Sequence, residues 1–297
     1  MEWLPTPSSD KITRQYLDSL LVEVRHIDAE IPDTAFTCFG RCFSAPITTG
    51  ALSHLHRTRE NGMAEMARGA HLADMIAFSG MGPESELEGM VNTGASVIKI
   101  IKTYQDRQSI ARKIRHAESC GAFAVGMDID HAFSNGKGYD CIEGMEMRPL
   151  KLCELKDFVA STPLPFVIKG VLSVQDALKC KEAGVKGIVV SHHNGRLNYS
   201  VPPLMVLPEI RKAVGPEMVI FVDCAIETGL DVFKAIALGA NACSVGRPLM
   251  GSLKNGGAEE VAVHMQRIQS DLSYTMAMTC CHTLSDISAD ILHKRTF

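Results

Sequence analysis

The sequence of 297 residues has no long hydrophobic run, no strong excess of either charge, and few aromatic residues. No apolar run approaches the ~20 residues that span a bilayer, and the N-terminus lacks the charged-then-apolar layout of a secretory signal. We therefore expect no membrane partner and a cytoplasmic location. The formal net charge of −4 gives no electrostatic reason to expect nucleic acid as a partner. The expected partner is a small molecule.

The sequence also lacks the cysteine spacings that are typical of metal sites and redox motifs. Its ten cysteines are scattered and no CxxC pair occurs, so we interpret them as reduced, mostly buried thiols. The spacing of Cys38 and Cys42 and the Cys280–Cys281 pair are not accompanied by a nearby set of His or Cys at ligand spacing. We predict no metal site.

A repeated pattern of short apolar strand, polar or glycine turn and amphipathic helix runs through the chain. Eight such units predict a (β/α)8 TIM barrel in the α/β class. The alternative is a doubly wound open sheet, which usually has a GxGxxG loop after its first strand, and APITTGALS does not contain one. The predicted strands cover residues 45–51, 74–80, 96–102, 122–130, 165–171, 187–193, 219–225 and 242–248.

No linker or low-complexity segment divides the chain, so we predict a single domain over residues 1–297. Residues 1–44 are expected to form an N-terminal capping segment, with a helix near 10–24 and a small hairpin at the bottom of the barrel. Residues 45–297 are expected to form the barrel and its terminal helices, the last of which are predicted over 257–280 and 283–293.

Polar side chains gather where the predicted strands end, and the active site of a TIM barrel lies at the carboxyl ends of its strands. Lys169 ends one strand, while His193 and Arg196 end the next. Both strands of a parallel strand-helix-strand unit end on the same face, so these three side chains are expected to converge on one ligand. The other strand-end candidates are Ser79, Lys102, Asp128, Asp130, Ser191, Asp223, Gly246 and Arg247.

Gly246 and Arg247 follow the eighth predicted strand. Phosphate sites in this fold are commonly built near the ends of strands seven and eight, from backbone N–H groups at a helix N-terminus. An arginine there adds two parallel donors for phosphate oxygens. These two residues therefore predict a ligand that carries a phosphate.

Three segments carry a family resemblance: VIKGVLSVQDALKCKEAGVKGIVVSHHNGR, VDCAIETGLDVFKAIALGANACSVGRP and YTMAMTCCHTLSDI. Together they resemble the FMN-dependent α-hydroxy acid oxidases and dehydrogenases, the glycolate oxidase and lactate oxidase group. The similarity is continuous from about Leu20 to the C-terminus. It implies an FMN-binding TIM barrel that oxidises a 2-hydroxy acid or a related hydroxy compound. It also implies a homo-oligomer, expected to be a tetramer.

The resemblance further implies a role for each candidate residue. Lys169 is similar to the family lysine beside flavin N1 and O2, and His193 to the histidine base. Arg196 is similar to the arginine that anchors the substrate carboxylate, and Asp128 to the aspartate that orients the histidine. The implied substrate contacts are Arg196, Lys102 and His193. The implied FMN contacts are Gly50, Ala51, Ser79, Lys169, Ser191, Asp223, Ala225, Gly246 and Arg247.

The chain departs from the family pattern at several of these positions. Glu227 stands at the position of a second phosphate-binding arginine, and Lys102 at that of a substrate-binding tyrosine. A carboxylate repels a phosphate, so Glu227 must turn away or the phosphate must be held differently. The second carboxylate-binding arginine beyond the fourth strand is also missing. Two alternatives therefore stay open: an FMN-dependent redox-neutral isomerase or lyase, and a degenerate barrel that binds a ligand without catalysis.

Overall fold

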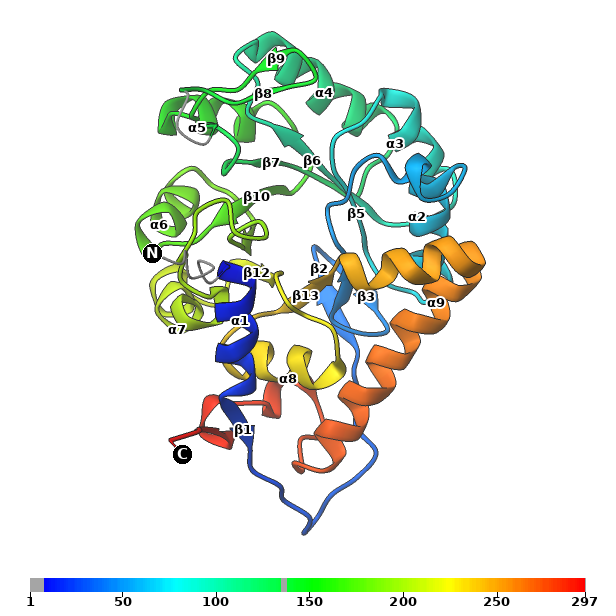
Figure 1. The fold of residues 1–297 in the computed structure, drawn as a ribbon, viewed down its shortest axis with the longest axis vertical. Coiled ribbons are helices and arrows are strands. Elements are labelled where there is room, and N and C mark those ends of the chain that lie inside the picture. Colours follow the sequence, from blue (N-terminus) through cyan, green and yellow to red (C-terminus); the bar gives the residue numbers. More distant parts are fainter. Residues whose placement is uncertain (1–7, 135–137, 297) are drawn as a thin grey trace, which may run out of the picture.

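A computed structural model describes residues 8–134 and 138–296 of the chain. Its main sheet is parallel, has eight strands and runs in the order β4-β13-β12-β11-β10-β7-β6-β5. A parallel bridge between Thr48 and Ile76 brings the two edge strands together, so the sheet closes into a barrel. Helices surround this barrel (Figure 1). The predicted (β/α)8 TIM barrel is confirmed.

Each predicted strand segment contains one observed barrel strand, and most observed strands end before the predicted boundary. The polar residues at the ends of several predictions belong to the loops that form the top face, not to the hydrogen-bonded ladder. The barrel strands are β4 (Ile47–Thr49), β5 (Ala77–Ser79), β6 (Val97–Lys102), β7 (Ala124–Asp128), β10 (Phe166–Val171), β11 (Gly187–Val190), β12 (Val219–Val222) and β13 (Ala242–Val245).

Helix starts follow from local capping. The Asp106 carboxylate and the Ser173 hydroxyl each accept a backbone N–H from the first turn of the helix that follows. The long α9 is interrupted at Gly257, whose φ of 64° is not helical, and two segments are visible in Figure 1. The helices are α1 (Ser9–Asp18), α2 (Gly62–Leu72), α3 (Glu84–Val91), α4 (Arg107–Ser119), α5 (Leu152–Ala160), α6 (Val174–Glu182), α7 (Pro203–Val214), α8 (Gly229–Ala237) and α9 (Arg247–Ala277).

The N-terminal segment contains the predicted helix and the predicted hairpin. The hairpin consists of β2 (Phe36–Cys38) and β3 (Arg41–Phe43), and it packs against the inner barrel cluster. The helix ends at Asp18 and not near residue 24, because the chain continues into β1 (Leu20–Val22). This strand pairs antiparallel with β14 (Leu292–Lys294).

The predicted helix over 283–293 is wrong. The structure has two short 3-10 turns there, Leu284–Asp286 and Ala289–Ile291, followed by β14. The Asp286 carboxylate accepts the backbone N–H groups of His282 and Thr283, at 3.0 and 2.7 Å. Such local side-chain bonds compete with a continuous helix. A small hairpin between β7 and α5 was not predicted; its strands are β8 (Cys141–Ile142) and β9 (Met145–Glu146).

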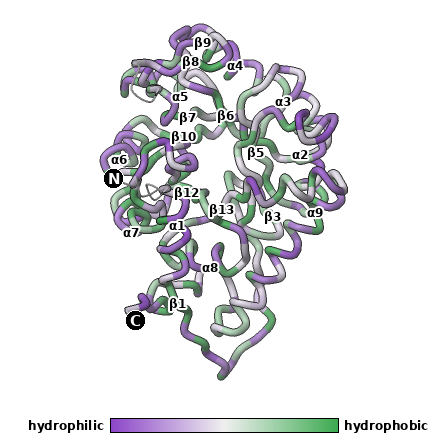
Figure 2. The backbone as a smooth tube through the Cα atoms, in the orientation of Figure 1, coloured by the Kyte–Doolittle hydropathy of each residue, from purple (hydrophilic) through white to green (hydrophobic). Residues whose placement is uncertain are grey.

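Two apolar layers position the site. One fills the barrel and includes Ile98 and Ile100, while the other lies between strands and helices and includes Val97 and Ile101. Successive side chains of a strand point to opposite faces, so Lys102, two residues after Ile100, faces the barrel axis. Hydrophilic segments lie mostly at the periphery (Figure 2). Within the described residues, no helix combines the length and the apolarity needed to cross a membrane.

Candidate active site

Three charged residues form one layer at the carboxyl ends of adjacent strands. In the strand register, Asp128 of β7 pairs with Lys102 of β6 on one side and with Lys169 of β10 on the other. The Lys102 Nζ atom lies 2.7 Å from Asp128 Oδ2, and the two side chains are 12% and 3% exposed. The barrel therefore presents a buried row of alternating charge, lysine-aspartate-lysine, at the mouth where the sequence predicted a site.

His193 follows β11 and has a left-handed backbone, with φ of 49°. Its backbone N–H donates to Ser191 Oγ at 3.0 Å. Its Nδ1 lies 2.8 Å from Asp130 Oδ1 and 3.4 Å from Asp128 Oδ2. An ionised carboxylate can only accept, so Nδ1 carries the proton. Burial lowers the pKa of His193, but the hydrogen bonds to both aspartates outweigh burial, and the net shift is upward.

Two aspartates contact His193, and the role of Asp128 in orienting this histidine stays a prediction. The shorter contact is made by Asp130, because Asp128 ends its strand between two lysines and its Oδ2 is bonded to Lys102. Burial and the neighbouring Asp128 carboxylate raise the pKa of Asp130. Burial would also raise the pKa of Asp128, but Lys169 and the other nearby donors lower it well below its usual range. Asp130 thus makes the shorter contact with His193, while Asp128 contacts His193 and is also the counter-ion of the lysines.

Lys169 is a buried, permanently charged ammonium. It is 5% exposed, and its Nζ lies 3.1 Å from His193 Nδ1 and 3.8 Å from Asp223 Oδ2. Burial alone would lower the pKa of Lys169, but the carboxylates of Asp128, Asp223 and Asp130 outweigh burial and raise it. The ammonium is therefore available to stabilise negative charge that develops beside it.

His131 faces His193 across the site, and the sequence analysis missed it. The two rings are 4.5 Å apart, and their Nε2 atoms 3.3 Å apart. Burial, with help from Lys102 and His193, lowers the pKa of His131 to about 4, so this ring is neutral at pH 7. Its Nδ1 donates a hydrogen bond to Asp140 Oδ2 at 3.3 Å, so in the neutral ring the Nε2 atom that faces His193 carries no proton. The histidine directly follows Asp130, but no spacing signal marks it.

Arg196 lies beside this cluster and belongs to the same network. Its Nη2 donates to Asp140 Oδ2 at 2.9 Å and to the Phe133 carbonyl at 2.6 Å. Its side chain is 33% exposed. Asp140 thus contacts both Arg196 and His131, and it is a second residue that the sequence analysis missed. The loop after β7, where the family pattern places an arginine, here supplies a carboxylate.

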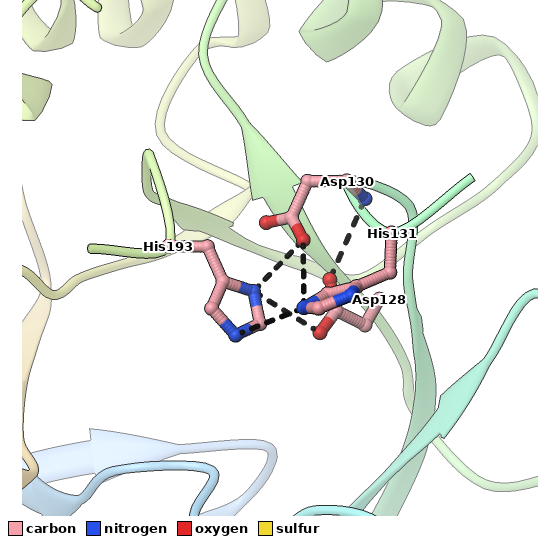
Figure 3. Close-up of side chains that lie close together, drawn as sticks. All are labelled: Asp128, Asp130, His131 and His193. Atoms are coloured by element: carbon pink, nitrogen blue, oxygen red, sulfur yellow. Dashed lines mark hydrogen bonds and ion pairs between the residues drawn. The ribbon is translucent and has the colours of Figure 1, made fainter. Parts of the chain in front are cut away.

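Four side chains of the cluster have the mutual spacing of metal ligands (Figure 3). The ammonium groups of Lys102 and Lys169 already lie against its carboxylates, so a divalent cation would meet two fixed positive charges. The chemistry of the cluster is that of an ion-pair network around a histidine. Its ligand atoms, which all lie within 4.8 Å of one another, belong to Asp128, Asp130, His131 and His193.

A cavity of about 640 Å³ opens beside the cluster, a volume suited to a cofactor. A Cβ on Gly50 would lie 2.8 Å from the Gly246 Cα, so this close backbone approach requires glycine.

Ser79 lies outside the cavity lining, is 1% exposed and accepts from Lys99 Nζ at 3.3 Å. Lys102, Asp128, Ser191 and Arg196 also lie outside the lining. The predicted residues that line the cavity are Gly50, Ala51, Lys169, His193, Asp223, Ala225, Gly246 and Arg247.

The fold and the site together define a TIM-barrel enzyme with a place for a phosphate-bearing cofactor. The family model for FMN-dependent dehydrogenase matches residues 11–155 and 141–294. The chain belongs to this family, and it is an oxidoreductase whose cofactor is FMN.

Known relatives and solved structures agree with this assignment. The chain is 28% identical over 305 residues to a peroxisomal (S)-2-hydroxyacid oxidase of Arabidopsis thaliana, with 91% of this chain and 83% of the relative covered. Glycolate oxidase of Spinacia oleracea is also 28% identical, with 91% and 81% covered. L-lactate oxidase of a Roseobacter strain is 39% identical over 47% of this chain and 38% of its own length. A mandelate oxidase structure with a C4a-OH-FMN adduct superposes with a TM-score of 0.86 at 27% identity, covering 98% of this chain and 92% of that chain.

The residues present fit FMN. Lys169 lines the cavity and provides a cation, and Gly246 and Arg247 line it at the first turn of α9, a helix N-terminus that favours phosphate. Glu227 lines this same cavity. Glu227 is exposed, so its carboxylate must turn to solvent or the phosphate must be held by other groups.

Proposed function

We propose that this protein oxidises a 2-hydroxy acid, with His193 as the base and FMN as the electron acceptor. The observation that carries the proposal is that His193 and Lys169 line a cavity of cofactor size, with Asp130 bonded to His193. FMN, when bound, takes up the two electrons that leave the substrate. The relatives named for hydroxy acids support the substrate class.

The protein's own residues set up the proton transfer. Asp130 holds the Nδ1 proton of His193, so Nε2 is the nitrogen that takes the proton from the substrate. The raised pKa of His193 makes it a better acceptor, and Asp130 stabilises the imidazolium that forms. Without substrate, His193 Nε2 faces the neutral His131 ring, so the substrate must displace His131 from His193 Nε2. Lys169 stabilises the negative charge that develops at the other side of the site.

Arg196 is proposed to anchor the substrate carboxylate, although its guanidinium is bonded to Asp140. A substrate carboxylate would have to compete with Asp140 for the same donor. The missing second arginine and this competition both weaken the binding of a small acid such as glycolate. We therefore propose a larger hydroxy acid, with further contacts of its own, as the substrate.

Anaerobic mixing of the FMN-loaded protein with a panel of 2-hydroxy acids tests the proposal. A substrate should remove the visible absorption of oxidised FMN. The variant His193→Ala should keep its bound FMN and lose this bleaching, while His71→Ala, an exposed position on α2, should behave like the unmodified protein. Bleaching that persists in His193→Ala would rule out its role as the base.

One observation favours a second candidate, an FMN-dependent redox-neutral isomerase or lyase. The Lys102–Asp128 pair stands where a family tyrosine binds substrate, and it adds a cation and a carboxylate to the site. Such a pair can act on a substrate proton without net electron transfer. Product formation without bleaching and without an electron acceptor would support this candidate over oxidation.

We also propose a homo-oligomer, with a tetramer as the expected form, in the cytoplasm. The loop between β1 and β2, at the bottom of Figure 1, carries Ile27 and Ile31, which are 85% and 95% exposed. Large exposed apolar side chains in a protruding loop favour an interface. All ten cysteines are free thiols, which is typical of a reducing compartment. Light scattering after gel filtration should show a lower mass for the double variant Ile27→Ser/Ile31→Ser, and an unchanged mass would exclude this loop from the interface.

A further inference from the structure

The cavity lining includes two carboxylates that would repel a phosphate bound at the first turn of α9. Glu227 lies on the loop after β12, and Asp10 lies on α1. Arg247, the cation expected to hold the phosphate, donates from Nη2 to Asp10 Oδ2 at 2.9 Å and to Asn194 Oδ1 at 3.0 Å. Its positive charge is thus already matched by Asp10. A phosphate with about two negative charges needs a further cation.

Helix α1 contributes to the cavity lining and is tied to the loop that carries Glu227. Arg14 of α1 donates to the Ala225 carbonyl at 3.1 Å and to Asp231 Oδ1 at 2.9 Å. The other carboxylate oxygen of Asp231 accepts the backbone N–H of Glu227 at 3.1 Å. Arg14 therefore positions the helix, and its charge is engaged by this carboxylate.

Lys11 lies three residues before Arg14, which puts both side chains on neighbouring positions of one helix face. Lys11 lines the same cavity as Glu227 and Gly246, and the residue is exposed. Across residues 8–134 and 138–296, the Lys11 ammonium takes part in no hydrogen bond or ion pair. The other cations that line the cavity, Arg14, Lys169 and Arg247, each have a carboxylate partner. Lys11 is thus the cation of the cavity lining that has no carboxylate partner among the described residues.

We propose that Lys11 binds the FMN phosphate together with Arg247 and the first turn of α9, in place of the arginine that the family pattern has at position 227. The N-terminal helix thereby becomes part of the cofactor site. Glu227 then acts against the phosphate and limits the affinity for FMN. The inference rests on FMN as the cofactor and is independent of which substrate is oxidised.

Binding of two flavins to the apoprotein tests the proposal. Riboflavin lacks the phosphate, so the ratio of its dissociation constant to that of FMN reports the phosphate contacts alone. Flavin fluorescence gives both constants. In Lys11→Gln the FMN affinity should fall about two- to fivefold, the range for one exposed charge contact, with riboflavin binding unchanged. Lys11→Arg should keep most of the FMN affinity.

Glu227→Gln tests the predicted repulsion between this carboxylate and the FMN phosphate. Removing this carboxylate should raise the FMN affinity about threefold, again without a change for riboflavin. The matched control is Lys212→Gln on α7, an exposed lysine outside the cavity lining, which should change neither constant. Raising the salt concentration should weaken FMN binding less in Lys11→Gln than in the unmodified protein, because one screened contact is gone.

An unchanged FMN-to-riboflavin ratio in Lys11→Gln would overturn the proposal. An equal loss for both flavins would overturn it too, because it would indicate that Lys11 only supports the fold of α1. These measurements use oxidised flavin and no substrate. A failure to find a hydroxy acid substrate would therefore refute the proposed oxidation and leave this inference standing.

Discussion

Replacing Lys102 by methionine should destabilise the apoprotein by about 3 kcal/mol. The variant keeps a similar side-chain volume but removes the ammonium 2.7 Å from Asp128 Oδ2. The Asp128 side chain is 3% exposed, so its charge cannot be rehydrated in place. Breaking a buried ion pair from one side typically costs about 3–5 kcal/mol. We expect the lower end, because Lys169 on the neighbouring strand still attracts the carboxylate.

A double-mutant cycle tests whether the unpaired Asp128 charge causes the destabilisation of Lys102→Met. The variant Lys102→Met/Asp128→Asn removes both charges, so it should recover more than half of the loss. Urea unfolding, followed by circular dichroism, measures Lys102→Met, Asp128→Asn and the double variant, with Lys212→Met as an exposed control. Equal destabilisation of the single and double variants would refute the reasoning, because lost packing and not an unpaired charge would then be responsible.

The pH dependence gives an independent check on the same pair. The pKa of Asp128 is depressed in the folded protein, so its contribution to the free energy of unfolding is complete above the ordinary aspartate pKa. That contribution is lost as the pH falls through the depressed folded pKa. In Lys102→Met this acid-side loss of stability should be smaller than in the unmodified protein. An identical acid-side slope in the two proteins would show that Lys102 does not set this pKa.

Three further predictions concern the site. Because the pKa of His193 is raised, kcat/KM should fall as the pH drops through that value, and Asp130→Asn should move this fall to lower pH; an unmoved profile would contradict the pairing. Gly50→Ala puts a Cβ 2.8 Å from the Gly246 Cα and should cost about 1–3 kcal/mol in urea unfolding, with weaker FMN binding. Arg14→Gln should release α1 and speed limited proteolysis at the N-terminal segment, and unchanged cleavage would argue against its anchoring role.

The barrel was predictable from the sequence because each of its strands is a short apolar run followed by a polar residue or glycine. The same pattern located Lys169 and His193, since parallel strands end on one face. It failed for residues 283–293, where apolar residues at helical spacing predicted a helix. Local side-chain bonds decided the structure there.

The partner of His193 could not be chosen from spacing alone. Asp128 and Asp130 are two residues apart and share one side of a strand, so periodicity treats them alike. What separates them is the neighbouring strand, because the register puts Lys102 and Lys169 on either side of Asp128. That contact depends on pairing between strands distant in sequence. Asp130, one step beyond the ladder, is left to meet His193 from the next loop.

The loop residues His131 and Asp140 had no sequence signal, yet they change the chemistry of the site. Asp140 engages Arg196 and His131 together, so the group that should hold a substrate carboxylate already has a carboxylate partner. A substrate that replaces this partner must supply at least an equal charge at the same place. A hydroxy compound without a carboxylate would leave the Arg196–Asp140 pair intact and would gain nothing from it. The Arg196–Asp140 pair therefore raises the cost of binding an acid, and an acid substrate must recover that cost through its other contacts.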